Sequence, residues 1–159
     1  TRLNKSLLLL SKIDNNQFSE TALVVMNDVL GRFLDDYKEV YDYRGIEVDV
    51  RNDGVFEVDM NDMLATILVT NLLKNAFVHN VDGGSIEIRF SSDAMEFRNT
   101  GDGTALDPQR IFERFYQGKK REGSTGLGLA IAHSICLQSG LRIVYEYAEG
   151  MHCFRVSRD

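Results

Sequence analysis

Apolar residues recur at helical spacing in four segments of the chain. In the first segment Leu3, Leu7 and Leu10 lie three or four positions apart, which places them on one face of a helix. Ser19 is the expected N-cap of the second helix, and Gly45 is its expected end. The four predicted helices cover residues 1–14, 20–43, 60–79 and 126–138.

Shorter segments alternate apolar with polar residues, which is the period of a half-buried strand. Asn52-Asp53-Gly54 separates the first two and predicts a hairpin turn, and Glu149-Gly150 separates the last two. Strand pairs therefore alternate with helices along the chain. The simplest architecture is a two-layer α/β (α+β) sandwich, with one mixed sheet and its helices on one face. The predicted strands cover residues 46–50, 55–58, 86–90, 95–97, 143–147 and 154–156.

Residues 99–125 break this regular pattern. They contain the only proline, Pro108, and the basic run Lys119-Lys120-Arg121. A long irregular segment within a compact domain is usually functional. A short helix is expected inside it, from Pro108 to Tyr116, and the segment from Ile111 to Tyr116 with the glycines around it is expected to form a mobile lid.

Composition narrows the class of protein. The chain has 159 residues, of which 43% are hydrophobic and 26% charged, as expected of one globular domain. Its net charge of −6 disfavours nucleic-acid binding and requires any phosphate site to gather positive charge locally. No apolar run approaches the roughly 18 residues of a membrane span. Cys136 and Cys153 are expected to be buried, reduced thiols, and the histidines lack the spacing of a zinc site.

Two features suggest a nucleotide site. Asn71 and Asn75 stand four residues apart in a predicted helix, so their side chains share a face and offer neutral oxygens to a hard cation. The run from Gly123 to Leu129 is rich in glycine and leads into another helix. Unpaired N–H groups at such a helix start bind phosphate. Together the two features predict a magnesium–nucleotide site that spans two helices.

Four blocks in this order resemble the ATP-binding catalytic domain of sensor histidine kinases. The resemblance implies the Bergerat fold of the GHKL (HATPase) family, shared with gyrase, Hsp90 and mismatch-repair ATPases. It divides the chain into residues 1–18, the tail of the second helix of a dimerisation and phosphoacceptor domain with its linker, and residues 19–159, the ATP-binding domain. The blocks are Asn71-Leu-Leu-Lys-Asn75-Ala76, Asn99-Thr-Gly101-Asp-Gly103, Ile111-Phe-Glu-Arg114-Phe115-Tyr116 and Gly123-Ser-Thr-Gly126-Leu-Gly128-Leu.

The resemblance assigns roles to residues of these blocks. It implies that Asn75 is a Mg²⁺ ligand, that Asn71 supports the phosphates of ATP, and that His79 lies near the adenine. Two positions depart from the family: Asn99 replaces the aspartate that accepts the adenine amino group, and Val78 replaces a frequent lysine. The Asn99 oxygen can still accept that amino group, and its NH₂ can donate to the neighbouring ring nitrogen. The implied nucleotide-binding set is Asn71, Asn75, His79, Asn99, Gly101, Gly103, Arg114, Tyr116, Lys119, Thr125, Gly126, Leu127 and Gly128.

None of the three histidines is followed by an acidic residue, as the phosphoacceptor of these kinases is. The expected activity is therefore that of a catalytic fragment, which positions the γ-phosphoryl group of ATP·Mg²⁺ for a histidine elsewhere. The implied partners are the phosphoacceptor domain of the same kinase and a response regulator, in the cytoplasmic portion of a membrane-bound sensor. Two alternatives stay open: another GHKL ATPase or serine kinase, and a non-catalytic module that binds a partner protein.

Overall fold

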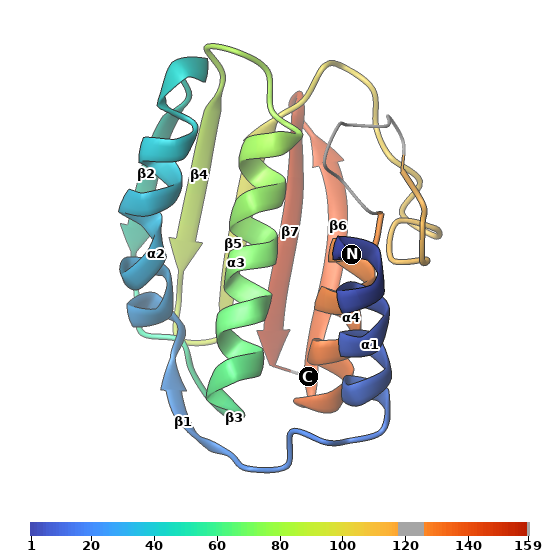
Figure 1. The fold of residues 1–159 in the computed structure, drawn as a ribbon. Helices are drawn as coiled ribbons and strands as arrows, with labels where there is room; N and C mark the ends of the chain where they lie inside the picture. The colour runs from blue at the N-terminus through green and yellow to red at the C-terminus, as the bar shows by residue number, and fades with distance from the viewer. Residues whose placement is uncertain (118–125, 159) are drawn as a thin grey trace.

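The fold is known from a computed structural model that describes residues 1–117 and 126–158. Five strands form the main sheet in the order β2-β4-β5-β7-β6, and helices cover one of its faces (Figure 1). The strands are β2 (Glu47–Asn52), β4 (Ser85–Phe90), β5 (Ala94–Thr100), β6 (Leu141–Ala148) and β7 (Met151–Arg158). Only the β2–β4 pair is parallel, so the sheet is mixed, as the sequence predicts.

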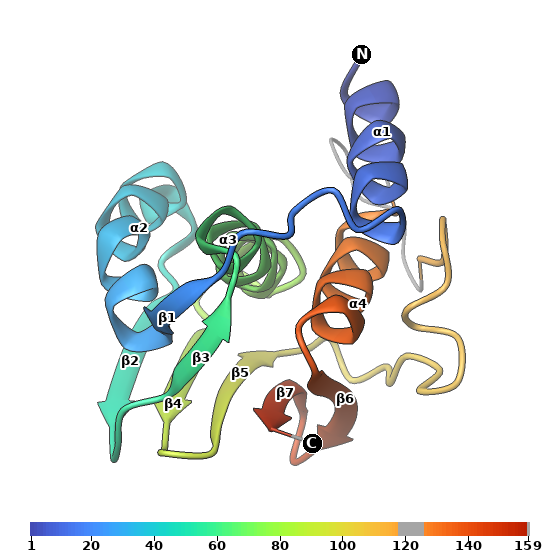
Figure 2. The same cartoon turned by 90° about the horizontal axis from the view of Figure 1, so that it is seen from below.

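Three helices lie directly on the sheet and a fourth lies outside them (Figure 2). The inner three are α2 (Met26–Val40), α3 (Asp62–Val78) and α4 (Gly128–Gln138). The outer helix, α1 (Arg2–Asp14), packs on α4. The four predicted helical segments are thus confirmed, although the second begins later than expected.

The core lies between the helices and the sheet. The helix α3 is its centre, because eight of its residues are buried and it packs against both α2 and α4. The other face of the sheet carries charges that pair across strands, such as Arg98 with Glu87 at 3.8 Å and Arg155 with Glu96 at 3.2 Å. Within the described residues, no helix is long and apolar enough to cross a bilayer.

The start of the second predicted helix is wrong, because residues 22–25 form a strand. This strand, β1 (Ala22–Val25), pairs antiparallel with β3 (Glu57–Met60) in a separate two-stranded sheet. Val24 and Val25 are β-branched and favour extended backbone. Ser19 is therefore not the N-cap of α2, which starts after Val25 without a side-chain cap.

The predicted hairpin around Asn52-Asp53-Gly54 is also wrong. Its two strands join different sheets, because β2 pairs with β4 while β3 pairs with β1. Two hydrogen bonds hold the connection instead. The backbone N–H of Asp53 donates to the carbonyl of Phe90 at 2.9 Å, and the side-chain amide of Asn27 donates to the carbonyl of Gly54 at 3.0 Å. A turn signal fixes local backbone direction but not the strand that is paired afterwards.

The short helix expected from Pro108 to Tyr116 is absent, and these residues form successive turns. The N–H of Phe115 donates to the carbonyl of Gly126 at 2.8 Å, and Phe115 has a positive φ of 65°. This bond ties the segment to the chain that enters α4, and a continuous helix would not allow it. Of the expected lid, residues 118–125 lie outside the described part of the chain.

Candidate functional site

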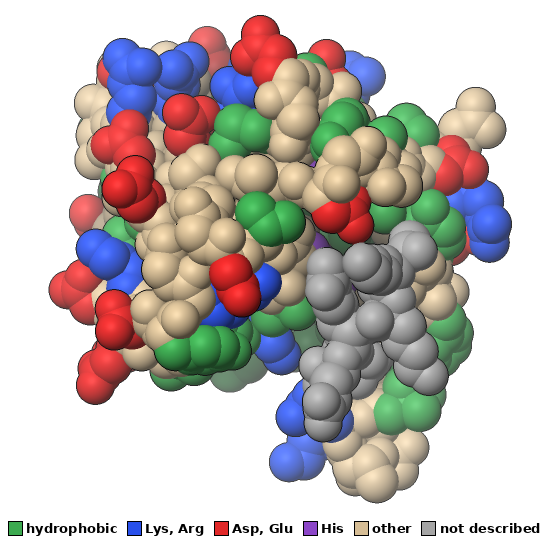
Figure 3. Space-filling model, turned by 90° about the horizontal axis from the view of Figure 1, so that it is seen from above, with side chains coloured by type: hydrophobic (Ala, Val, Ile, Leu, Met, Phe, Trp, Pro, Cys, Tyr) green, Lys and Arg blue, Asp and Glu red, His purple; other side chains and the backbone are tan. Residues whose placement is uncertain are grey.

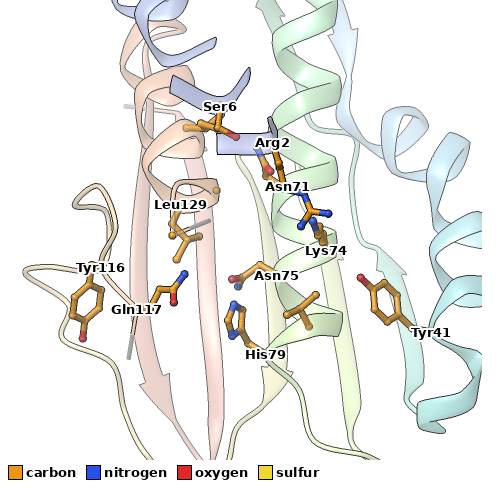
Figure 4. A pocket seen from close by; sticks show the side chains of 14 residues that line it. Arg2, Ser6, Tyr41, Asn71, Lys74, Asn75, His79, Tyr116, Gln117 and Leu129 are labelled. Atoms are coloured by element: carbon orange, nitrogen blue, oxygen red, sulfur yellow. The ribbon is translucent and has the colours of Figure 1, made fainter. Parts of the chain in front are cut away.

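A cavity of about 390 Å³ opens between α3, α4 and the start of α1 (Figure 4). Asn71, Asn75 and His79 come from one side of α3 and its end, and Gly128 and Leu129 come from the start of α4. Segments more than fifty residues apart in the sequence thus form one site. The other lining residues are Arg2, Ser6, Tyr41, Lys74, Val78, Tyr116, Gln117, Gly126 and Ile131.

The asparagines owe their position to the way α3 begins. The N-cap residue Asn61 accepts the amide of Leu64 at 3.1 Å, which satisfies one of the free N–H groups of the first turn. Residues 71, 75 and 79 then fall four apart on the side of α3 that faces the cavity (Figure 4). The buried face of the same helix fixes this orientation, because Leu68 and Leu72 have 0% and 1% of their surface exposed.

Arg44 holds the other end of α3. Its guanidinium donates to the carbonyls of Phe77, Val78 and Asn80, the last at 2.8 Å, and its side chain is only 13% exposed. Asp82 neutralises it at 2.8 Å. A cation at a helix C-terminus satisfies carbonyls that have no partner within the helix, and it opposes the negative end of the helix dipole. Arg44 therefore supports the part of α3 that carries Val78 and His79 into the cavity.

The glycine-rich segment brings the start of α4 close to the asparagines. Gly126 has a φ of +75°, and a Cβ atom there would lie 2.9 Å from the Cα of Phe115. A Cβ at Gly128 would lie 3.7 Å from Oδ1 of Asn71. The 2.9 Å approach at Gly126 needs the absence of a side chain, whereas the 3.7 Å distance at Gly128 is an ordinary van der Waals contact and shows that the start of α4 lies beside Asn71. The start of α4, where the first backbone N–H groups of a helix have no partner within that helix, therefore borders the same cavity as the carboxamides of α3.

Asn99 is not among the residues that line this cavity, and only 1% of its surface is exposed. Its amide nitrogen donates to the carbonyls of His79 at 3.2 Å and Thr100 at 3.1 Å. Both N–H groups are thus used within the fold, so a donation from Asn99 to an adenine ring nitrogen would have to replace one of these two bonds. The carboxamide oxygen is the atom with which Asn99 can receive a ligand donor.

Gly101 follows Asn99 and packs on the ring of His152. A Cβ atom at Gly101 would lie 2.6 Å from Nε2 of His152. Glycine is therefore needed here to make room for the His152 ring, which the sequence did not indicate. The other ring nitrogen of His152 lies 2.7 Å from the hydroxyl of Tyr145, which also accepts the amide of Leu106 at 3.1 Å. Burial lowers the pKa of His152, although nearby Asp102 partly opposes this shift.

The structure brings together six of the predicted residues and separates others. Arg114 forms an ion pair with Asp14 at 3.2 Å and does not line the cavity. Leu127 is fully buried, and Gly101 and Gly103 lie in the loop that follows β5. Lys119 and Thr125 fall outside the described residues. The six that line the cavity are Asn71, Asn75, His79, Tyr116, Gly126 and Gly128.

Sequence reasoning missed several lining residues, among them Arg2, Ser6, Tyr41, Lys74 and Gln117. Lys74 had a usable signal, because it lies three residues after Asn71 and so on a neighbouring part of the helix surface. Arg2 and Ser6 had none, because their contribution depends on how α1 packs. Tyr41 stacks on Phe77 with ring centroids 5.1 Å apart, and burial raises the pKa of its hydroxyl.

The cavity differs in charge from the rest of the protein. The chain carries a net charge of −6, yet no aspartate or glutamate is among the described residues that line the cavity, whereas Arg2 and Lys74 are. Acidic side chains are prominent on the side of the molecule away from the protruding α1 (Figure 3). An anion is therefore favoured in this cavity over other parts of the surface.

The described residues show no other candidate for metal chemistry. No group of three histidine, cysteine or acidic side chains in them could hold a metal ion. Cys136 and Cys153 are free and buried, as predicted, and burial raises the pKa of both thiols to about 12. Among the described residues that line the cavity, Asn71, Asn75 and Gln117 carry carboxamide oxygens, which suit a hard cation.

Comparison with known proteins places the chain among ATPases. The family model described as "Histidine kinase-, DNA gyrase B-, and HSP90-like ATPase" matches residues 60–157. The sensor histidine kinase RppB of Synechocystis is 31% identical over 162 residues, which cover 94% of this chain and 36% of RppB. The heme sensor protein HssS of Staphylococcus aureus is 34% identical over 145 residues, which cover 84% of this chain and 30% of HssS. The chain thus spans about a third of the length of these relatives.

A solved structure supports the fold. The cytoplasmic segment of the histidine kinase QseC superposes with a TM-score of 0.75 at 18% sequence identity. The match covers 99% of this chain and 89% of that one. At this level of identity the likeness concerns the fold, and it extends over α1 as well as the sheet and its helices.

Proposed function

The chain belongs to the family of histidine kinase-, DNA gyrase B- and HSP90-like ATPases, and from this premise we propose that its cavity holds ATP·Mg²⁺ for phosphoryl transfer to a histidine outside the chain. The observation that carries the proposal is the position of Asn71 and Asn75 opposite the glycine-rich start of α4. Carboxamide oxygens, the backbone N–H groups of a helix start and the lack of acidic side chains among the described lining residues together suit a nucleotide with its cation.

The donor set fits Mg²⁺. Asn75 offers a neutral oxygen, and Asn71 offers another one turn away on the same side of α3. Magnesium in nucleotide sites takes few protein ligands and completes its shell with phosphate oxygens and water. In this proposal Asn75 ligates the ion and Asn71 supports the phosphates; the bound ion neutralises charge on the phosphate oxygens.

The adenine is proposed to reach the floor of the site near His79 and Asn99. The amide of Asn99 donates to the backbone of His79, so these two residues form one unit. Because the amide nitrogen of Asn99 bonds to two carbonyls of the fold, its carboxamide oxygen is the atom proposed to accept the adenine amino group, as an aspartate would. Asn99 in place of aspartate is therefore compatible with adenine recognition, without a donor to the ring.

The chain's own residues would act by positioning. Catalysis of phosphoryl transfer depends mostly on alignment and charge neutralisation, with the nucleophile supplied by the acceptor. The chain's histidines have other places: His133 stacks on Phe112 with ring centroids 5.3 Å apart, and His152 is buried beside Tyr145. We propose that the acceptor lies in a phosphoacceptor domain to which residues 1–18 belong, and that residues 19–159 form the ATP-binding domain.

The wider assignment follows from the relatives. RppB is a sensor histidine kinase, so we propose a response regulator as the eventual recipient of the phosphoryl group and the cytoplasmic side of a membrane-bound sensor as the location. Mixing this chain with a separate phosphoacceptor domain should yield acid-labile phosphohistidine, whereas the chain alone should yield none. An acid-stable product would instead identify a serine kinase.

Calorimetric titration with ATP in the presence and absence of Mg²⁺ tests the core of the proposal. The wild-type chain should bind with a dissociation constant between micromolar and millimolar, or roughly −8 to −4 kcal/mol. Asn75→Ala should abolish the magnesium-dependent part of the affinity, whereas Asn4→Ala, at an exposed asparagine of α1, should leave it unchanged. A wild-type chain that shows neither heat nor thermal stabilisation with millimolar ATP would refute the proposal and favour a non-catalytic partner-binding module.

A further inference from the structure

The helix α1 contributes to the cavity although it precedes the ATPase fold in the chain. Arg2 and Ser6 line the same cavity as Asn71 and Asn75, and Figure 4 shows Arg2 close to Asn71. On the premise of the proposed function, we propose that Arg2 binds the phosphate tail of ATP, so that the nucleotide site is complete only while α1 is docked on α4.

The geometry of α1 explains how Arg2 reaches the site. Residues 2, 6, 9 and 13 follow one face of a helix, because the spacing is three or four residues. The lower part of this face is apolar and packed: Leu9 lies against the core, and Ile13 has only 1% of its surface exposed. The upper part carries Arg2 and Ser6 into the cavity. Burial at one end of α1 thus sets the position of the polar residues at the other.

Specific contacts hold the docked helix. The side-chain amide of Gln138, at the end of α4, donates to the carbonyl of Ile13 at 2.8 Å. Asp14 pairs with Arg114, which belongs to the segment that leads towards the glycine-rich loop. The lower end of α1 is therefore tied both to α4 and to that segment, and both of these also supply residues to the cavity.

Charge indicates what Arg2 would bind. Val78, three residues after Asn75, lines the cavity without bringing a charge to it. Arg2 and Lys74 are the residues with a permanent positive charge among the described lining. A guanidinium matches a phosphate group with two parallel hydrogen bonds, which a lysine ammonium does not. The phosphates are therefore the part of the nucleotide that Arg2 fits.

Affinity for nucleotides with different numbers of phosphates tests this assignment. Arg2→Ala should weaken ATP binding about five- to tenfold and change AMP binding less than twofold, and Arg2→Lys should restore part of the ATP affinity. Lys5→Ala removes the same charge from an exposed position of α1 that does not line the cavity, so it should have little effect. Isothermal titration of the full chain at one ionic strength provides all of these constants.

Hydrogen exchange tests the link to docking. ATP·Mg²⁺ should slow exchange of the backbone amides of α1 in the wild-type chain, and by a smaller factor in Arg2→Ala. Both variants of Arg2 must first show the wild-type melting temperature without ligand, which excludes a general loss of structure. A purely structural role of Arg2 would affect ATP and AMP binding equally.

The two proposals fail in different ways. If the wild-type chain binds ATP and Asn75→Ala abolishes binding, but Arg2→Ala keeps ATP affinity within twofold, only the role of Arg2 is refuted. Equal losses for ATP and AMP, or unchanged protection of α1, would refute it as well. If the wild-type chain does not bind ATP at all, both the proposed function and the role of Arg2 are refuted.

Discussion

Replacement of Arg44 by alanine should destabilise the chain more than its place near the surface suggests. Three carbonyls at the end of α3 would lose a charged donor that is only 13% exposed. Hydrogen bonds to charged groups contribute about 1.5–3 kcal/mol each, and those of one guanidinium are not additive. Water can reach part of the site after truncation. We therefore expect a loss of about 3 kcal/mol in the free energy of unfolding.

Urea unfolding followed by circular dichroism measures this loss, and the melting temperature should fall by about 6–12 °C for a chain of this size. Arg32→Ala is the matched control, because its ion pair with Asp62 is 3.7 Å long and its side chain is 51% exposed. Such a pair contributes less than about 1 kcal/mol. If Arg44→Ala lowers the free energy of unfolding no more than Arg32→Ala does, the carbonyls do not depend on the guanidinium and this prediction is refuted.

Three further predictions concern backbone, histidine and thiols. Gly126→Ala should lower the melting temperature and weaken ATP binding, because its φ is +75° and a Cβ atom would lie 2.9 Å from the backbone of Phe115. The control Gly31→Ala lies in open space on α2 and should raise the free energy of unfolding by about 0.5–1 kcal/mol. His152 has a lowered pKa, so the unfolded chain takes up its proton first and stability should fall as pH drops below about 6.5, by at most about 1.4 kcal/mol per pH unit. Urea unfolding at pH 7.5 and 5.5 should show a flatter dependence in His152→Gln, and equal slopes would contradict this. Cys136 and Cys153 should resist a disulfide reagent at pH 8 in the folded chain and react in urea, since burial raises both thiol pKa values to about 12; rapid reaction of either thiol without urea would show that the burial is wrong.

The sequence predicted those parts of the fold that local pattern determines. The long periodic segments became α1, α3 and α4, and the last two strands pair as neighbours around Gly150. It failed where long-range pairing decides. Leu23 and Met26 fit a helical period, but residues 22–25 pair with β3. Leu23 therefore lies in the strand β1, and Met26 is the first residue of α2.

The site shows the same division. Asn71 and Asn75 could be predicted because one helix sets their spacing. Gly126 and Gly128 could be predicted because a glycine-rich run before a helix is a local sequence pattern. Arg2 could not, because its place depends on tertiary packing of α1 on α4. The orientation of the Asn99 side-chain amide could not be predicted either, because two backbone carbonyls from different segments determine it.

The two outermost strands of the main sheet, β2 and β6, carry charges at the positions that point away from the helices. Glu47 and Asp49 on β2, and Arg142 and Glu146 on β6, are exposed. An added strand from another molecule would have to bring its own side chains against these charges, which discourages edge-to-edge aggregation. A domain protected in this way can stay soluble at high local concentration, where identical sheets would otherwise extend into one another.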